Sequence, residues 1–127
     1  MSARILVIED QEQNLYLVTY ILERRGHRVI AARDGRTGVS IARSAVPDLI
    51  LLDIQLPTMT GYEVAEALRS ESALSHVPII AVTSYAMPGD REQAMAAGCA
   101  GYIEKPIDPD TFAGEVEAYL TPEGEAE

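Results

Sequence analysis

The sequence predicts an α/β domain in which a parallel five-stranded sheet is covered by helices on both faces. Three observations support this prediction: five short apolar runs recur along the chain, a segment with helical periodicity follows each run, and turn residues separate them. Unbroken apolar runs are typical of strands buried on both faces, as in parallel sheets. The carboxyl ends of such strands lie at one edge of the sheet, where ligands bind.

The same patterns locate the individual elements. Strands are expected at residues 4–8, 28–32, 48–53, 77–82 and 100–103, and helices at residues 11–25, 36–44, 62–71, 89–97 and 108–120. Gly26 is well placed to end the first helix, because glycine adopts the left-handed conformation readily. Asp108 and Pro109 are expected to begin the last helix, as its N-cap and first-turn residue.

Length and composition limit the classes of function. The 127 residues suffice for one domain, expected over residues 1–121, with an acidic tail at 122–127 and no second domain. The net charge of −10 disfavours nucleic acid and anionic membranes as partners. We expect no membrane insertion, since no apolar run is long enough to span a bilayer. The single cysteine, Cys99, favours a reducing, cytoplasmic location.

Polar residues follow four of the predicted strands. Glu9 and Asp10 follow the first strand, Asp53 ends the third, Thr83 follows the fourth and Lys105 follows the fifth. We expect these side chains to meet at one edge of the sheet. Taken alone, Asp53 could equally cap the turn after it, and the charged residues could form a surface ion-pair cluster. Neither alternative accounts for three carboxylates together with a hydroxyl.

This set of side chains suits a phosphoryl group. Three close carboxylates repel one another, and Mg²⁺, or Mn²⁺ in its place, relieves that repulsion with few protein ligands. A carboxylate can act as a nucleophile toward phosphorus, and phosphoryl transfer needs mainly positioning and charge neutralisation. We therefore expect Asp53 to accept a phosphoryl group whose oxygens contact the metal, the Thr83 hydroxyl and the Lys105 ammonium. The sequence places no general base for turnover nearby.

These motifs resemble those of the receiver domain of two-component response regulators, over essentially the whole chain. The matching residues are Glu9-Asp10, Asp53 in the segment Pro-Asp-Leu-Ile-Leu-Leu-Asp-Ile-Gln-Leu-Pro, Gly61, Thr83 and Lys105-Pro106. The resemblance implies the flavodoxin-like fold with strand order 2-1-3-4-5 and five helices on two faces. It also implies a stand-alone receiver without an output domain, acting as a phosphoacceptor in a phosphorelay.

The resemblance further implies specific roles. A histidine kinase or histidine phosphotransferase would phosphorylate Asp53, with Mg²⁺ bound by Asp10, Asp53 and the backbone carbonyl of Gln55, and with Glu9 supporting the metal. A cis peptide bond is implied between Lys105 and Pro106. The expected activity is signalling, with at most slow self-phosphorylation and autodephosphorylation, and not that of an enzyme.

A switch and two surfaces follow from the same resemblance. Tyr102 would turn inward when Thr83 is drawn to the phosphoryl group, altering partner binding at the face made by the fourth helix, fifth strand and fifth helix. The alternative is that Tyr102 has no switching role and is an ordinary aromatic residue of a strand, packed at the edge of the core. Tyr16, Leu17 and Tyr20 are expected to point outward from the first helix and to form the docking surface for the phosphodonor protein.

The sequence disfavours two alternative functions and leaves a third open. An aspartyl-nucleophile phosphatase needs an acid two residues after the nucleophile, where this chain has Gln55. An FMN carrier needs a phosphate-binding loop after the first strand, where residues 9–12 would repel a phosphate. A scaffold that acts independently of phosphorylation stays open. Gln11 and Ser84 depart from the residues frequent in the family and leave the lifetime of the phosphoryl group open.

Three further residues are expected to have no role in the site. His27 and His76 are expected in loops, exposed to solvent, and neither has metal-ligand spacing to another histidine or cysteine. Cys99 is expected to be a small packed residue and not a reactive thiol.

Overall fold

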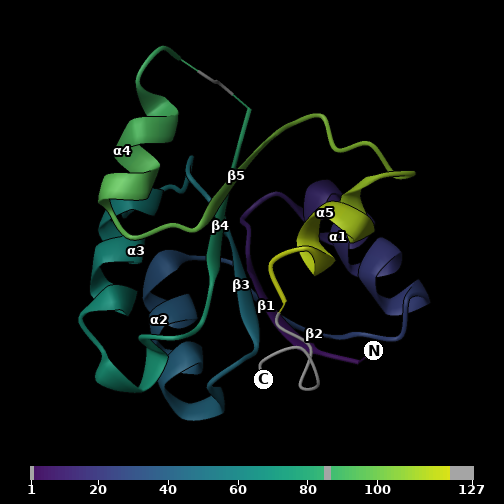
Figure 1. The fold of residues 1–127 in the computed structure, drawn as a ribbon, viewed down its shortest axis with the longest axis horizontal. Coiled ribbons are helices and arrows are strands. Elements are labelled where there is room, and N and C mark those ends of the chain that lie inside the picture. Colours follow the sequence, from purple (N-terminus) through teal and green to yellow (C-terminus); the bar gives the residue numbers. More distant parts are fainter. Residues whose placement is uncertain (1, 85–86, 121–127) are drawn as a thin grey trace.

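The computed structural model describes residues 2–84 and 87–120 and contains one parallel sheet of five strands. The strands are β1 (Arg4–Ile8), β2 (Arg28–Ala32), β3 (Leu49–Asp53), β4 (Ile79–Thr83) and β5 (Gly101–Glu104). Their order is β2-β1-β3-β4-β5, and each neighbouring pair is parallel (Figure 1). The predicted strand order and sheet type are confirmed.

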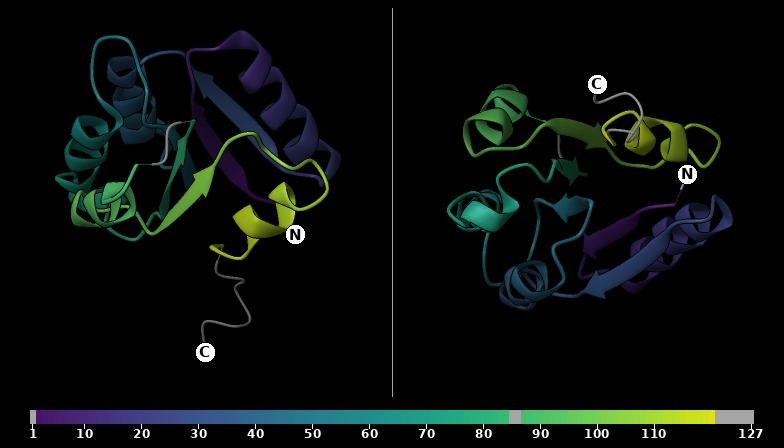
Figure 2. Two further views of the ribbon diagram at one scale, coloured as in Figure 1. Left: turned by 90° about the horizontal axis from the view of Figure 1, so that it is seen from above. Right: turned by 60° about the horizontal axis from the view of Figure 1, so that its bottom comes forward.

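Helices cover both faces of this sheet. They are α1 (Glu12–Arg24), α2 (Gly35–Ala45), α3 (Gly61–Arg69), α4 (Asp90–Ala96), α5 (Phe112–Glu117) and a short 3₁₀ helix, η1 (Ser72–Leu74), which the sequence patterns did not predict. Helices α1 and α5 lie on one face, and α2, α3 and α4 lie on the other (Figures 1 and 2). In the described part of the chain, no helix combines the length and apolar character needed to cross a membrane.

Alternation along each strand divides the core into two layers. In β1, Ile5 and Val7 pack with the α1 and α5 side chains, whereas Leu6 and Ile8 pack with those of α2, α3 and α4. Strands β3 and β4 are buried along their whole length. Because both faces of these central strands exclude water, polar side chains occur where the strands end.

A close contact positions the chain immediately after β3. Gly61 begins α3 so near to this strand that a Cβ atom there would lie 2.5 Å from the Ile54 Cα atom and 2.9 Å from the Asp53 carbonyl oxygen. Only glycine fits such an approach without moving the backbone. The helix is then held by a capping box between Thr60 and Glu63. Gly61 therefore lets α3 pack directly beneath the end of β3.

The start of the last helix differs from the prediction. Helix α5 begins at Phe112 with Thr111 as its N-cap, and not at Asp108 and Pro109. The Asp108 side chain instead accepts a hydrogen bond from the Asp110 backbone N–H at 2.9 Å, and its carbonyl accepts one from Phe112 at 2.9 Å. Asp108 thus caps a turn over residues 108–111 that leads directly into α5, because its side-chain and carbonyl oxygens accept the N–H groups of the residues that follow.

The expectation that His27 is exposed was wrong. His27 is 3% exposed and links three parts of the chain. Its Nδ1 atom accepts a hydrogen bond from the Ala3 backbone N–H at 3.0 Å, so its proton lies on Nε2, which donates to the Glu117 carboxylate at 2.8 Å. Arg25 also donates two hydrogen bonds to Glu117, at 2.5 and 3.1 Å. His76 is exposed, as expected.

We predict that Glu117→Gln lowers the free energy of unfolding by about 1–2 kcal/mol at pH 7, because it weakens the bonds to Arg25 and His27. Hydrogen bonding from Arg25 lowers the pKa of Glu117 from 4.5 to about 2. A carboxyl group with a lowered pKa stabilises the fold above its unfolded pKa and loses that contribution as the pH falls through the folded value. The difference between the two proteins in urea unfolding should therefore shrink between pH 4.5 and pH 2. A difference that stays constant over this range would contradict the prediction.

Candidate functional site

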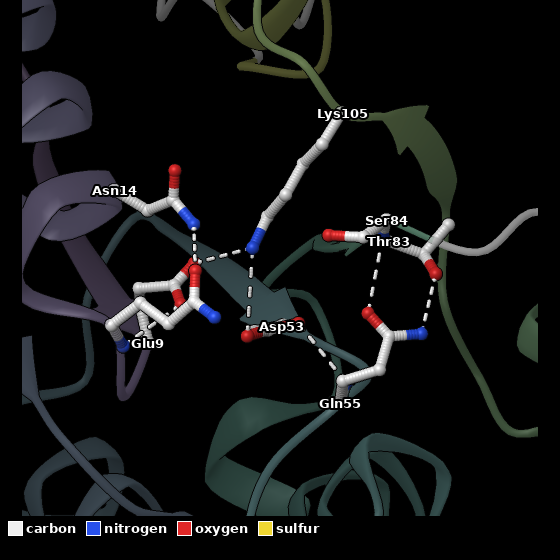
Figure 3. A network of polar contacts seen from close by, with 8 residues as sticks. Glu9, Asn14, Asp53, Gln55, Thr83, Ser84 and Lys105 are labelled. Atoms are coloured by element: carbon white, nitrogen blue, oxygen red, sulfur yellow. Dashed lines mark hydrogen bonds and ion pairs between the residues drawn. The ribbon is translucent and has the colours of Figure 1, made fainter.

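The strand-end residues meet at one edge of the sheet. Asp53 ends β3, Thr83 ends β4 beside Glu104 of β5, and Lys105 follows β5. Glu9 and Asp10 follow β1, the neighbour of β3 on its other side. Figure 3 shows the side chains of Glu9, Asp53 and Lys105 directed toward one another from these three strands. The peptide bond between Lys105 and Pro106 is cis, in agreement with the expectation.

Lys105 connects two of the carboxylates. Its Nζ atom lies 3.0 Å from Glu9 Oε1 and 3.6 Å from Asp53 Oδ2. Glu9 and Asp53 are each 3% exposed, and the lysine side chain is 8% exposed. Backbone N–H groups contact the remaining oxygens: Gln11 donates to Glu9 Oε2 at 3.1 Å, and Gln55 donates to Asp53 Oδ1 at 3.0 Å. Each buried carboxylate therefore has one cationic and one backbone partner.

The three carboxylates form a set suited to a divalent cation. One oxygen each of Glu9, Asp10 and Asp53 lies within 4.8 Å of the others. Asp10 is half-buried, so this side of the site faces water. Three carboxylates and one ammonium leave excess negative charge, and hard oxygen ligands with access to water suit Mg²⁺. The residues present thus fit the metal that the sequence predicts.

The electrostatics of Asp53 reflect the same crowding. Burial, followed by the neighbouring Glu9 carboxylate, raises the pKa of the Asp53 carboxyl from 3.8 to about 7. The Gln55 backbone N–H and the Lys105 ammonium oppose this rise. A cation beside Asp53 would favour its ionised form, which is the form that can act as a nucleophile.

The Gln55 side chain has contacts that sequence reasoning missed. Its Nε2 atom donates a hydrogen bond to Thr83 Oγ1 at 2.7 Å, and its Oε1 atom accepts one from the Ser84 backbone N–H at 3.1 Å. In Figure 3 the carboxamide of Gln55 faces Thr83 and Ser84 across the gap between β3 and β4. The sequence predicted a role for the Gln55 carbonyl alone, because no local pattern indicates which strand a side chain in this turn will face.

Tyr102 lies on β5, away from the carboxylates. Its ring is half-buried against the core, and the Arg91 guanidinium carbon lies 5.4 Å from the ring centroid. Its hydroxyl is buried and lacks a hydrogen-bond partner among the described residues. Burial is the main cause of the raised pKa of this phenol. Beside it, a groove of about 460 Å³ runs between β5 and α5, lined in part by Ile103, Glu115 and Tyr119.

The prediction that three side chains of α1 point outward is partly correct. Tyr16 and Tyr20 are 73% and 50% exposed, and their rings stack with centroids 6.4 Å apart. Arg24 extends this row by lying 5.6 Å from the centre of the Tyr20 ring. Leu17 was expected to point outward, but it is half-buried and packs against the core between α1 and α5, because its position on the helix lies at the edge of the buried stripe.

Cys99 behaves as expected. It is buried in the core layer under α2, α3 and α4. Burial raises the pKa of its thiol to about 11, so the reactive thiolate is scarce at neutral pH.

Comparisons with known proteins agree with this geometry. The response regulator receiver domain model matches residues 5–117. The polar-differentiation response regulators DivK of Brucella ovis and Brucella anthropi are each 41% identical to this chain over 120 residues, which covers 94% of this chain and 98% of theirs. A resemblance to DivK was also suggested by the sequence around Asp53, Thr83 and Tyr102.

Solved structures give the same result. The chemotaxis protein CheY4 of Vibrio cholerae has a TM-score of 0.89 and 30% identity, over 94% of this chain and 100% of its own. The receiver domain of a sensor histidine kinase from Pseudomonas aeruginosa has a TM-score of 0.85 and 32% identity, over 94% of this chain and 98% of its own. That structure has a magnesium ion coordinated in its active-site cleft.

We predict that Asp53→Asn stabilises the metal-free protein by about 1–3 kcal/mol at pH 8, since it removes a buried negative charge. A carboxyl group whose pKa is raised on folding costs stability once the pH exceeds its unfolded pKa, and the cost is complete above the folded pKa. Thermal unfolding without Mg²⁺ should therefore show the advantage of the variant growing between pH 4 and pH 7. Adding Mg²⁺ should stabilise the wild type more than the variant. An equal effect of Mg²⁺ on both proteins would argue against a metal at this carboxylate.

Proposed function

The chain belongs to the response regulator receiver family, and from this premise we propose that Asp53 accepts a phosphoryl group from a phosphohistidine of a histidine kinase or histidine phosphotransferase. One observation carries the proposal: the buried Asp53 carboxylate lies 3.6 Å from the Lys105 ammonium and within a cluster of three carboxylates. This arrangement combines a nucleophile with the means to neutralise a phosphoryl group.

The proposed transfer is a direct displacement at phosphorus. A carboxylate oxygen of Asp53 forms a bond to phosphorus as the bond from phosphorus to the donor imidazole nitrogen breaks, and the imidazole keeps the electron pair. Lys105 would then move from its bond with Glu9 toward a phosphoryl oxygen, and the Thr83 hydroxyl would donate to another. Mg²⁺, held by Asp10, Asp53 and the Gln55 carbonyl with support from Glu9, would supply positive charge to the phosphoryl oxygens.

The environment of Asp53 favours holding the phosphoryl group over rapid hydrolysis. The residue two positions later, Gln55, is neutral and its carboxamide is already bonded to Thr83 and Ser84. It therefore offers no acid or base for turnover, which argues against an aspartyl-nucleophile phosphatase. We propose a signalling protein with at most slow self-phosphorylation and autodephosphorylation, acting in the cytoplasm.

The signal would leave the site through Thr83 and Tyr102. Recruitment of the Thr83 hydroxyl by the phosphoryl group would free space for the Tyr102 ring to turn inward, where its hydroxyl could gain a hydrogen-bond partner. The groove between β5 and α5 adjoins Tyr102 and would change shape with it. We propose that this chain, like DivK, acts as a response regulator, and that the face formed by its α4, β5 and α5 binds the downstream protein.

We predict that wild-type protein incubated with a small phosphodonor and Mg²⁺ gains one phosphoryl group, because Asp53 is the nucleophile, and that Asp53→Asn gains none. Intact mass spectrometry measures both. Removal of Mg²⁺ with a chelator should abolish labelling of the wild type. Labelling of the variant to the same extent would place the acceptor elsewhere.

A second prediction concerns the exposed row of Tyr16, Tyr20 and Arg24 on α1, which we propose as the docking surface for the phosphodonor protein. Tyr20→Ala should raise the KM for a phosphohistidine donor protein about tenfold, because large aromatic side chains dominate interface energies. Labelling by a small phosphodonor should stay unchanged. Met95→Ala, which truncates an exposed apolar side chain on α4, serves as the control for transfer from the donor protein. Equal loss in both variants would exclude a specific role for α1.

A further inference from the structure

Gln55 connects the phosphoacceptor strand to the switch strand through three hydrogen bonds. Its backbone N–H donates to Asp53 Oδ1 at 3.0 Å. Its side chain crosses to β4, where it contacts Thr83 Oγ1 at 2.7 Å and the Ser84 backbone N–H at 3.1 Å. All three partners belong to the segments that respond to phosphorylation in the proposed function.

The direction of these bonds follows from their chemistry. A backbone N–H can only donate, so the Gln55 oxygen must face Ser84. The amide nitrogen consequently faces Thr83, and the Thr83 oxygen accepts. Exchanging the two ends of the carboxamide would place two donors together at Ser84. The carboxamide therefore has one favourable orientation, and it directs the Thr83 hydroxyl oxygen toward Gln55 (Figure 3).

We propose that Gln55 is a positioning residue that holds Thr83 and the start of the β4–α4 segment in the unphosphorylated arrangement. This inference rests on the proposed function, in which a phosphoryl oxygen becomes the partner of Thr83. The Thr83 hydroxyl accepts from the Gln55 amide and would donate to a phosphoryl oxygen, so the two contacts oppose each other through position. Thr83 would have to move away from the Gln55 amide when it is drawn to the phosphoryl group. The Ser84 contact extends the restraint to the backbone.

The restraint sets how much of the switched conformation exists before phosphorylation. A hydrogen bond made in the resting state alone shifts the equilibrium toward that state. One such bond corresponds to a shift of about 2- to 10-fold in the population ratio. Gln55 thus lowers basal signalling, and phosphorylation has to overcome its hold on Thr83.

The test compares Gln55→Met with the wild type. Methionine keeps the length of the side chain and removes both side-chain hydrogen bonds. Gln13→Met makes the same chemical change at an exposed position of α1 and serves as the matched control. The reporter is the NMR signal of the Tyr102 ring, a residue that lies two strands away from Gln55.

In unphosphorylated Gln55→Met, the Tyr102 signals should move toward their positions in the phosphorylated wild type, reflecting an increase of about 2- to 10-fold in the switched population. The Gln13→Met signals should stay at the resting positions. Tyr102 signals that stay at their resting positions in Gln55→Met would overturn the proposal. So would a phosphorylated Gln55→Met protein that falls short of the wild-type end point, since the amide would then assist Thr83 instead of restraining it.

Two measurements separate this proposal from its premise. If Gln55 acts through Thr83, then Gln55→Met should have no further effect on Tyr102 in a Thr83→Val background, and a persistent effect would overturn the proposal. The Ser84 backbone amide should also exchange its hydrogen at least about twofold faster in Gln55→Met. An unchanged exchange rate would overturn the proposal that Gln55 restrains this segment. Exchange needs no phosphorylation, so it remains decisive even if intact mass shows no labelling of the wild type.

Discussion

The Asp53 carboxyl group lies at the end of a strand that is buried on both faces, and the need to accommodate its charge there is the constraint on which this site depends. Water cannot solvate Asp53 from either face of β3, so its charge needs partners from neighbouring strands. Parallel strands supply them, because their carboxyl ends meet at one edge. Lys105 and two backbone N–H groups offset part of this negative charge, and the three carboxylates together suit a cation. In the proposed function, the same excess of negative charge draws the cation that assists attack on a phosphoryl group.

The surrounding fold keeps this edge rigid on one side and adjustable on the other. Gly61 allows α3 to pack directly against the end of β3, so the backbone at Asp53 has little freedom. On the other side, Thr83 Oγ1 accepts a side-chain hydrogen bond from Gln55, a kind of contact that exchanges partners at small energetic cost. The proposed switch uses this difference, with Asp53 on the closely packed side and Thr83 on the side whose contact can be exchanged.

At the edge of the sheet opposite the site, hydrogen bonds of a buried histidine connect the ends of α1 and α5. His27, in the loop after α1, receives a hydrogen bond from Ala3 and donates one to Glu117. It thereby connects the segment just before β1 with the end of α5. These contacts anchor the C-terminal end of α5 at the edge of the sheet opposite Asp53. Glu117 lies between Glu115 and Ala118, two residues that line the groove beside Tyr102, so the same contacts hold the α5 side of that groove.

The sequence by itself determined the alternation of strands and helices, the strand ends that carry Asp53, Thr83 and Lys105, and an acidic pair whose oxygens suit a divalent cation. These features follow from periodicity and from chemistry that each residue carries locally. Tertiary structure alone decided the contact of Gln55 with Thr83, the burial of His27 and the inward packing of Leu17. Each of these depends on which distant segment lies opposite a side chain, and a local pattern holds no information about that neighbour.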